Sequence, residues 1–193
     1  MSDEKDDWLR WTVQKKEPTT DYKIFGVRRQ RSRHNASSRD GLFSIVDSPD
    51  WINVVAITPD ENVIMVRQFR HGTDSITLEI PGGLVDPGED MLSAAQRELR
   101  EETGYVSDEW RALGPIHPNP AFMTNQCGLF LATNARCTSQ LELDPNEVIE
   151  VVSHPLRDVP SLIETGVITH SLVLSAFLRV SLLYPGWRLD SPR

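Results

Sequence analysis

Three glutamates close together in the sequence are the residues best suited to chemistry. Glu98, Glu101 and Glu102 stand at positions i, i+3 and i+4, so a helix here would present three carboxylates on one face. Carboxylates this close repel one another and would destabilise an isolated helix. Divalent cations would neutralise them, and oxygen-only ligands suit Mg2+ or Mn2+. The alternative is an acidic helix face exposed to solvent.

A Gly-Gly step lies upstream of these glutamates, at Gly82 and Gly83. Residues without side chains let the backbone approach a ligand closely, so a carbonyl at this step could complete a metal shell. Arg97 can reach Glu101 one helical turn later, and Glu89 lies near the expected helix start, where negative charge is favoured. We expect Arg97 and Glu89 to orient the site.

The elements that must position these residues are visible as apolar runs and turn signals. Strands are expected over residues 22–27, 42–46, 51–57, 63–69, 110–116, 128–132 and 148–152. Helices are expected from about Asp90 to Gly104, over 156–165 and over 171–183. The segment from Ser2 to about Pro18 should be a short helix or a tail docked through its tryptophans, and this order of elements indicates an α/β (α+β) sandwich.

The segment from Gly83 to Tyr105 reads GLVDPGEDMLSAAQRELREETGY. It fills every fixed position of the pattern G-x5-E-x7-R-E-U-x-E-E-x-G-U, where U is a bulky apolar residue, and so resembles the Nudix box. The resemblance implies a Nudix-type α/β/α sandwich with a mixed central sheet and a strand-loop-helix catalytic unit. It also implies that the three glutamates bind the metal, with the Gly82 carbonyl as a further ligand.

Similarity extends beyond the box. The stretches WINVVAITPDENVIMVRQFRHG and NPAFMTN resemble the branch that hydrolyses ADP-ribose and related nucleoside diphosphate sugars. In that branch a proline about fifteen residues past the box accompanies use of ADP-ribose, and Pro120 lies fifteen positions after Tyr105, although prolines are common in any loop. The resemblance implies substrate contacts for Pro120 and Phe122. The alternatives are another nucleotide substrate, such as GDP-mannose, a dinucleoside polyphosphate or an oxidised nucleotide, or a Nudix module that binds without catalysis.

Other substrate contacts are expected from cations and one aromatic residue. In the branch, the arginine that ends the VRQFR strand often faces the diphosphate, so Arg70 is the candidate clamp, and the alternative is a surface charge. Trp51 either stacks on a nucleobase or packs in the core. Arg29, with Arg31 and Arg33, either adds positive field around the substrate or is solvated.

A water nucleophile needs a general base, which the family usually places as a glutamate in a loop well beyond the box. The segment LELDPNEVIEV fits that loop. Glu147 follows Asp144, Pro145 and Asn146 and precedes an expected strand, so it matches best. Glu142 and Glu150 remain alternatives.

The charge balance bears on partners. The formal net charge is −8 and the sequence pI about 5.1, which disfavours nucleic acid and acidic membrane surfaces as partners. The longest apolar stretch, 172–183, is interrupted by Arg179 and falls short of the ~18 to 20 residues that cross a membrane. The N-terminus, MSDEKDDWLRW, has no apolar signal segment, so the cytoplasm is expected.

The two cysteines and the N-terminal part complete the expectations. Cys127 and Cys137 lack the spacing of a zinc site, and both are predicted to be reduced, buried thiols. Residues 1–48 resemble the antiparallel β extension through which this branch forms homodimers and completes its nucleotide sites. We therefore expect this extension, a hydrolase domain over 49–193, and a homodimer.

Overall fold

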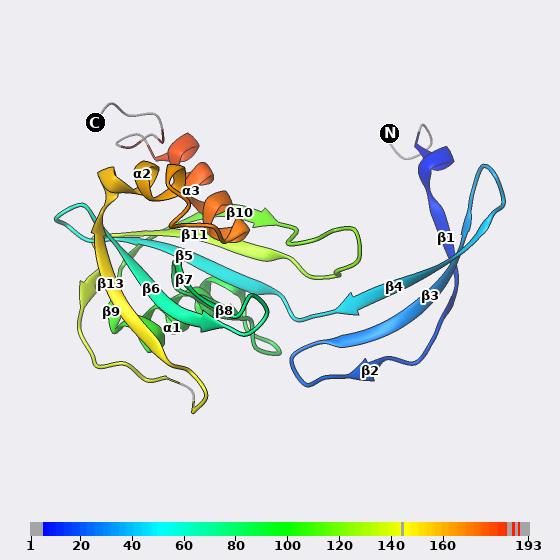
Figure 1. Ribbon diagram of the computed structural model, residues 1–193, viewed down its shortest axis with the longest axis horizontal. Helices are drawn as coiled ribbons and strands as arrows, with labels where there is room; N and C mark the ends of the chain where they lie inside the picture. The colour runs from blue at the N-terminus through cyan, green and yellow to red at the C-terminus, as the bar shows by residue number, and fades with distance from the viewer. Residues whose placement is uncertain (1–5, 144, 185–186, 188, 190–193) are drawn as a thin grey trace. The chain divides into compact units, whose positions relative to one another are not determined.

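Two compact units make up the computed structural model, which describes residues 6–143, 145–184, 187 and 189 (Figure 1). One unit comprises Met1–Pro49 and His117–Asn125, and the other Asp50–Ile116 and Gln126–Arg193. Two parts of the sequence expectations lie outside the described residues, namely the first five residues of the N-terminal segment and Asp144 of the expected base loop.

The first unit is an antiparallel sheet of four strands around β3. Its elements are η1 (Asp7–Leu9), β1 (Trp11–Lys16), β2 (Thr20–Asp21), β3 (Gly26–His34) and β4 (Asp40–Asp47). The expected strand over 42–46 is confirmed as β4. Of the two N-terminal tryptophans, Trp8 lies in the short 3-10 helix η1. Trp11 is the first residue of β1, so the chain from this point forms a strand rather than the expected helix or docked tail.

The strand expected over 22–27 is wrong, because a turn occupies most of that segment. Lys23 has a positive φ of 70°, and its N–H donates to Asp21 Oδ1 at 2.8 Å. A short polar side chain that accepts a hydrogen bond two residues on favours a turn. The strand therefore starts at Gly26 and continues through the arginines to His34. Alternation leaves Arg29, Arg31 and Arg33 exposed and buries Ser32 between them.

A loop from the middle of the chain belongs to this first unit. Residues 117–125 lie beside β4, where Val46 N–H donates to Phe122 O at 2.8 Å and Thr124 N–H donates to Val46 O at 3.1 Å. An isolated bridge also pairs Val46 with Met123. The loop thus continues the pairing of the N-terminal sheet.

The second unit contains a mixed sheet of seven strands in the order β10-β11-β5-β6-β13, with β7 paired to β6 and β8 to β5. Its only parallel pair among the described strands is β5 with β11. The strands are β5 (Trp51–Ile57), β6 (Asn62–Arg70), β7 (Ser75–Glu79), β8 (Gly82–Leu84), β10 (Glu109–Ile116), β11 (Cys127–Thr133) and β13 (Ile149–Pro155). A two-stranded ribbon and the helices complete it: β9 (Tyr105–Val106), β12 (Arg136–Cys137), α1 (Met91–Thr103), η2 (Leu156–Asp158), α2 (Val159–Glu164) and α3 (Ser171–Leu183).

One edge of β5 is shared by two strands. Its first residues, from Trp51 to Asn53, pair with β8, whereas Ala56 and Ile57 pair with β6. Between these pairings Val54 N–H donates to Pro81 O at 2.8 Å. The chain that leads from β7 into the Gly-Gly step is therefore held directly against the central strand.

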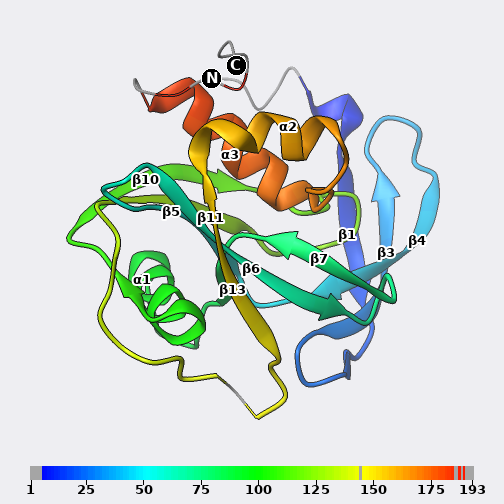
Figure 2. The ribbon, with the colours of Figure 1, turned by 60° about the vertical axis from the view of Figure 1, so that its left-hand side comes forward.

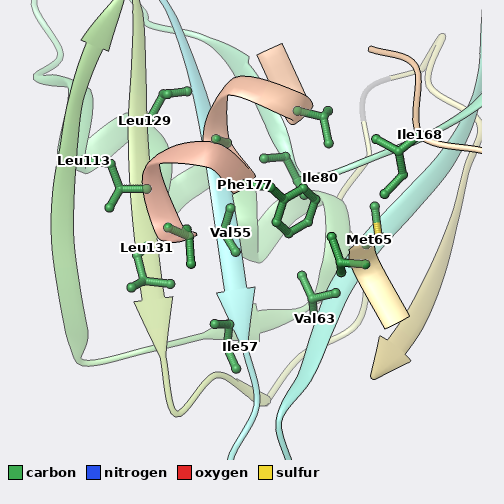
Figure 3. Packing of buried hydrophobic residues seen from close by; sticks show 14 of the residues in the cluster. Val55, Ile57, Val63, Met65, Ile80, Leu113, Leu129, Leu131, Ile168 and Phe177 are labelled. Atoms are coloured by element: carbon green, nitrogen blue, oxygen red, sulfur yellow. The ribbon is translucent and has the colours of Figure 1, made fainter. Parts of the chain in front are cut away.

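Helices cover both faces of this sheet, with α1 on one face and α2 and α3 on the other (Figure 2). Alternate residues of β5 enter the two cores, because successive side chains of a strand point to opposite faces. Val55 packs with Met65 and Phe177 of α3 (Figure 3). Val54 packs on the other face, in the cluster that contains Leu99 of α1. The expected α/β/α sandwich with a mixed sheet is confirmed.

Some details differ from the sequence expectations. The expected helix over 156–165 begins as a 3-10 turn, because Pro160 has no N–H to donate and tolerates only the first turn of a helix. Cys127 is buried as expected, but Cys137 is exposed because it lies in the short edge ribbon of β12.

Helix lengths bear on the membrane expectation. Among the described residues, no helix combines the length and the apolar character that a membrane crossing requires.

Candidate metal and diphosphate site

Local signals set the limits and rotation of α1. Asp90 caps its start, accepting hydrogen bonds from Leu92 N–H at 3.0 Å and Ser93 N–H at 3.1 Å. Gly104 ends it in the left-handed conformation at φ 72°. The buried face, which includes Leu99, docks on the sheet and so fixes where the neighbouring glutamates point.

Glu98 lies against the Gly-Gly step. A Cβ built on Gly83 would stand 2.2 Å from Glu98 Oε1, so a side chain at this position would displace the carboxylate. At Gly82 a Cβ would meet Asn53 Nδ2 at 2.3 Å and Ile52 O at 2.4 Å. Backbone and side-chain atoms of β5 therefore require a glycine at 82, whereas a side chain at 83 would push only the carboxylate of Glu98 aside. The sequence suggested instead that both glycines make room for a ligand.

Glu102 is the most buried carboxylate of the helix, with 3% of its surface exposed. Its Oε2 accepts a hydrogen bond from Gly82 N–H at 2.9 Å. Burial raises the pKa of Glu102 to about 8; the Gly82 hydrogen bond opposes the rise, and the charges of Glu98 and Glu147 add to it. Burial also raises the pKa of Glu98, against the opposing effect of Arg97.

Arg97 ties the acidic groups together, as the sequence predicted for Glu101. Its Nη1 donates to Glu98 Oε1 at 2.8 Å and to Glu101 Oε2 at 3.3 Å. Its Nε and Nη2 donate to the two carboxylate oxygens of Glu89 at 3.1 and 3.0 Å, and Nη2 also donates to Leu84 O at 3.0 Å. Arg97 thus connects the strand-loop segment to the acidic face of α1.

The donor set fits a hard divalent cation. In the described ranges, no three acidic, imidazole or thiol groups already form a complete metal shell; Arg97 and the Gly82 N–H instead satisfy the carboxylates. Glu102 is nonetheless buried and Glu98 half-buried, and the loss of solvent raises the pKa of both carboxyls. A cation bound by the carboxylate oxygens would neutralise this excess of negative charge. Oxygen donors suit Mg2+ or Mn2+.

Arg70 is held by a buried carboxylate that the sequence analysis did not single out. Its Nε and Nη2 donate to Glu79 Oε1 and Oε2 at 2.8 and 2.7 Å. The hydrogen bond to Glu79 is the largest cause that raises the pKa of Arg70, and the charges of Glu102 and Glu147 also raise it. Arg70 therefore lies within the field of the acidic site. A signal for Glu79 was present, because it is an acidic residue inside the apolar run ahead of the Gly-Gly step.

The three candidate bases differ in their surroundings. Glu147 is exposed, and its charge acts on Glu98, Glu102 and Arg70. The carboxylate of Glu142 lies 3.9 Å from Arg100, and that of Glu150 forms an exposed ion pair with Arg67. Glu147 is thus a loop carboxylate whose charge acts on the acidic cluster.

The remaining candidates fall in both units. Trp51 is half-buried in the second unit and packs against the hydrophobic cluster around α3, as its core interpretation requires. In the first unit, Arg29 is exposed and donates to Glu17 Oε2 at 2.9 Å. Pro120 and Phe122 are exposed in the loop paired with β4.

Comparison with known proteins agrees with this geometry. The NUDIX domain model matches residues 49–177. ADP-ribose pyrophosphatase of Bacillus subtilis (strain 168) is 34% identical over 122 residues, which are 63% of this chain and 66% of that protein, so the chain spans just under two thirds of its length. ADP compounds hydrolase NudE of Escherichia coli (strain K12) is 30% identical over 139 residues, covering 72% of this chain and 68% of that protein.

A third relative and a solved structure cover more of the chain. ADP-ribose pyrophosphatase of Mycobacterium tuberculosis (strain ATCC 25618 / H37Rv) is 28% identical over 173 residues, covering 88% of this chain and 82% of that protein. A crystal structure of an ADP compounds hydrolase is 25% identical, covers 92% of this chain and 95% of its own, and has a TM-score of 0.81. With the matched domain, the box and the sandwich fold together, the chain belongs to the Nudix family.

Proposed function

We propose that this protein is a Mg2+-dependent pyrophosphohydrolase, with Mn2+ as the alternative ion, that cleaves ADP-ribose or a related nucleoside diphosphate sugar. ADP-ribose would give AMP and ribose 5-phosphate. The observation that carries the proposal is the pair of neighbouring carboxylates, half-buried Glu98 and buried Glu102, which both feel the charge of Glu147. The charge of Arg70 acts on Glu102 as well. The names of the relatives support the substrate class.

Glu98, Glu101 and Glu102 would hold the metal, with the Gly82 carbonyl as a further ligand. When bound, Mg2+ would supply positive charge to neutralise the diphosphate and Lewis-acid activation of its phosphorus. Arg97 keeps Glu98 and Glu101 at fixed positions through its own hydrogen bonds. These contacts prepare the acidic face before substrate binds.

Glu147 serves as the general base in this scheme. Its exposed carboxylate accepts a proton from the attacking water, and the new bond joins the water oxygen to one phosphorus of the diphosphate. The other phosphate leaves with its bridging oxygen. Arg70 binds the diphosphate and stabilises the negative charge that builds up on the leaving group.

Substrate contacts and assembly form the finer part of the proposal. We assign nucleobase and sugar contacts to Trp51, Pro120 and Phe122, and a supporting positive field to Arg29. We further propose a homodimer formed through the N-terminal sheet, a cytoplasmic location, and no nucleic-acid partner. The net charge of −8 supports the last point, because it repels polyanions.

The experiment measures nucleoside monophosphate released from ADP-ribose, GDP-mannose, UDP-glucose, diadenosine polyphosphates and nucleoside triphosphates, with and without Mg2+. Glu102→Gln and Glu147→Gln should each lower kcat on the preferred substrate by about 10²- to 10⁴-fold. Glu61→Gln, the same chemical change at an exposed turn, is the matched control and should keep wild-type activity.

Two results would contradict this proposal in different ways. Absence of turnover on the whole panel, with ADP-ribose still bound, would favour a binding module over an enzyme. Full activity in Glu147→Gln, combined with loss of activity in Glu142→Gln or Glu150→Gln, would move the base to another residue of the same loop.

A further inference from the structure

Glu79 is a buried charged group that the proposed chemistry does not use. It ends β7 with only 1% of its surface exposed. Burial opposes its ionisation, yet hydrogen bonds from Arg70 and Thr77 bring the pKa of Glu79 below its ordinary value. His170 Nδ1 lies 3.9 Å from Glu79 Oε2. A carboxylate kept charged in such a place is costly unless its partners are well placed.

The β6–β7 hairpin explains how Glu79 meets Arg70. Gln68 pairs directly with Thr77, so their side chains lie on the same side of the sheet. Arg70 follows Gln68 by two residues, and Glu79 follows Thr77 by two. Because side chains alternate along a strand, both lie on that side as well. Thr77 Oγ1 donates to Glu79 Oε1 at 2.6 Å and so fixes the rotation of the carboxylate.

The two ends of the Arg70 side chain face different surroundings. Nε and Nη2 form a two-pronged contact with both oxygens of Glu79. Within the described part of the chain, the structure gives Nη1 no hydrogen-bond acceptor. The arginine side chain is 44% exposed, and the charges of Glu102 and Glu147 reach its guanidinium. One edge is therefore anchored, and donors remain for a ligand.

We propose that Glu79, oriented by Thr77, is a positioning residue that holds Arg70 by its Nε and Nη2 edge and leaves Nη1 for a non-bridging oxygen of the substrate diphosphate. This inference rests on the proposed function. A free arginine side chain loses much of its rotamer freedom when it binds a ligand. Anchoring by Glu79 removes most of that cost before substrate arrives.

The test uses the full-length protein with Glu79→Gln, Arg70→Ala and the double variant. Glutamine keeps the shape of Glu79 but lacks the charge and offers only one acceptor oxygen. The measurements are kcat and KM for ADP-ribose with Mg2+, the Kd of the non-hydrolysable α,β-methylene analogue of ADP-ribose, and the melting temperature. Arg67→Ala is the matched control, because Arg67 lies on the same strand in an exposed pair with Glu150.

We expect Glu79→Gln to lower kcat/KM and analogue affinity by about 10- to 100-fold, because a misplaced binding group costs that much. In Arg70→Ala the same change should have no further effect, since Glu79 acts through Arg70. Arg67→Ala should stay near wild type. Wild-type affinity in Glu79→Gln, or losses that multiply in the double variant, would overturn the positioning role.

A second variant guards against a folding defect. Thr77→Val removes one hydrogen bond to Glu79 while keeping the side-chain shape, and should lower analogue affinity in the same direction by about 3- to 10-fold. If Glu79→Gln does not fold, unchanged affinity in Thr77→Val overturns the inference. If the wild type does not hydrolyse ADP-ribose, the proposed function fails, and the analogue titrations still decide whether Glu79 positions Arg70.

Discussion

Glu102 couples the stability of the protein to pH and to metal. The variant that isolates this coupling is Glu102→Gln, because glutamine can still accept the hydrogen bond from Gly82 N–H but cannot ionise. Other titrating groups are shared by the two proteins. Their effects therefore cancel when the free energies of unfolding are compared at each pH.

The sign and size of the effect follow from the raised pKa. The Glu102 carboxyl loses its proton at about pH 8 in the folded chain, against an ordinary value of 4.5. The folded state thus binds more protons between these values, so its stability is fully present below pH 4.5 and declines as the pH rises toward 8. At about 1.4 kcal/mol per pKa unit, the whole loss is about 5 kcal/mol.

Urea unfolding at pH 5 and pH 8 in EDTA measures this loss. Relative to Glu102→Gln, the wild type should lose about 4 kcal/mol between the two pH values. Millimolar Mg2+ should restore the wild type at pH 8, with release of a proton, and should have much less effect on the variant. Equal pH dependence of the two proteins in EDTA would show that Glu102 is ionised throughout, and would refute the reasoning.

Three further changes test other parts of the structure. Gly83→Ala should lower Mg2+ affinity and activity at least about 10-fold, because the added Cβ displaces the carboxylate of Glu98. The melting temperature should change little, since only the end of that side chain moves. Unchanged metal affinity in calorimetry would contradict this prediction. Phe177→Ala should lower the free energy of unfolding by about 3 to 5 kcal/mol, measured in urea, because the ring is fully buried. Iodoacetamide at pH 8 should label the exposed thiol of Cys137 and spare Cys127, because burial raises the pKa of the Cys127 thiol to about 12. Mass spectrometry that shows rapid modification of both cysteines would contradict this expectation.

The catalytic helix could be predicted because its signals are local. Asp90 and Gly104 cap α1, and the spacing of the glutamates sets one acidic face, all within fifteen consecutive residues. The contact of Arg97 with Glu101 is likewise one helical turn long. Short-range rules of this kind can be applied without knowledge of how the rest of the chain folds.

Long-range pairings were less predictable. The contact between Arg70 and Glu79 depends on the register of the β6–β7 hairpin, and apolar runs do not reveal register when both faces are partly covered. The turn at Lys23 replaced an expected strand because a side-chain hydrogen bond outweighed strand propensity. The exposure of Cys137 likewise follows from an edge ribbon too short to recognise in sequence.

The loop paired with β4 has a consequence for protein engineering. Deleting the N-terminal sheet alone would remove the Val46 groups that hydrogen bond to residues 117–125. The two pieces should instead be removed or exchanged together, as one module. Strand β10 ends at Ile116, which pairs with Cys127, the first residue of the antiparallel strand β11, so a tight turn could join the two strands after excision. Chimaeras made this way would transplant both segments assigned here to substrate contacts while leaving the metal-binding helix untouched.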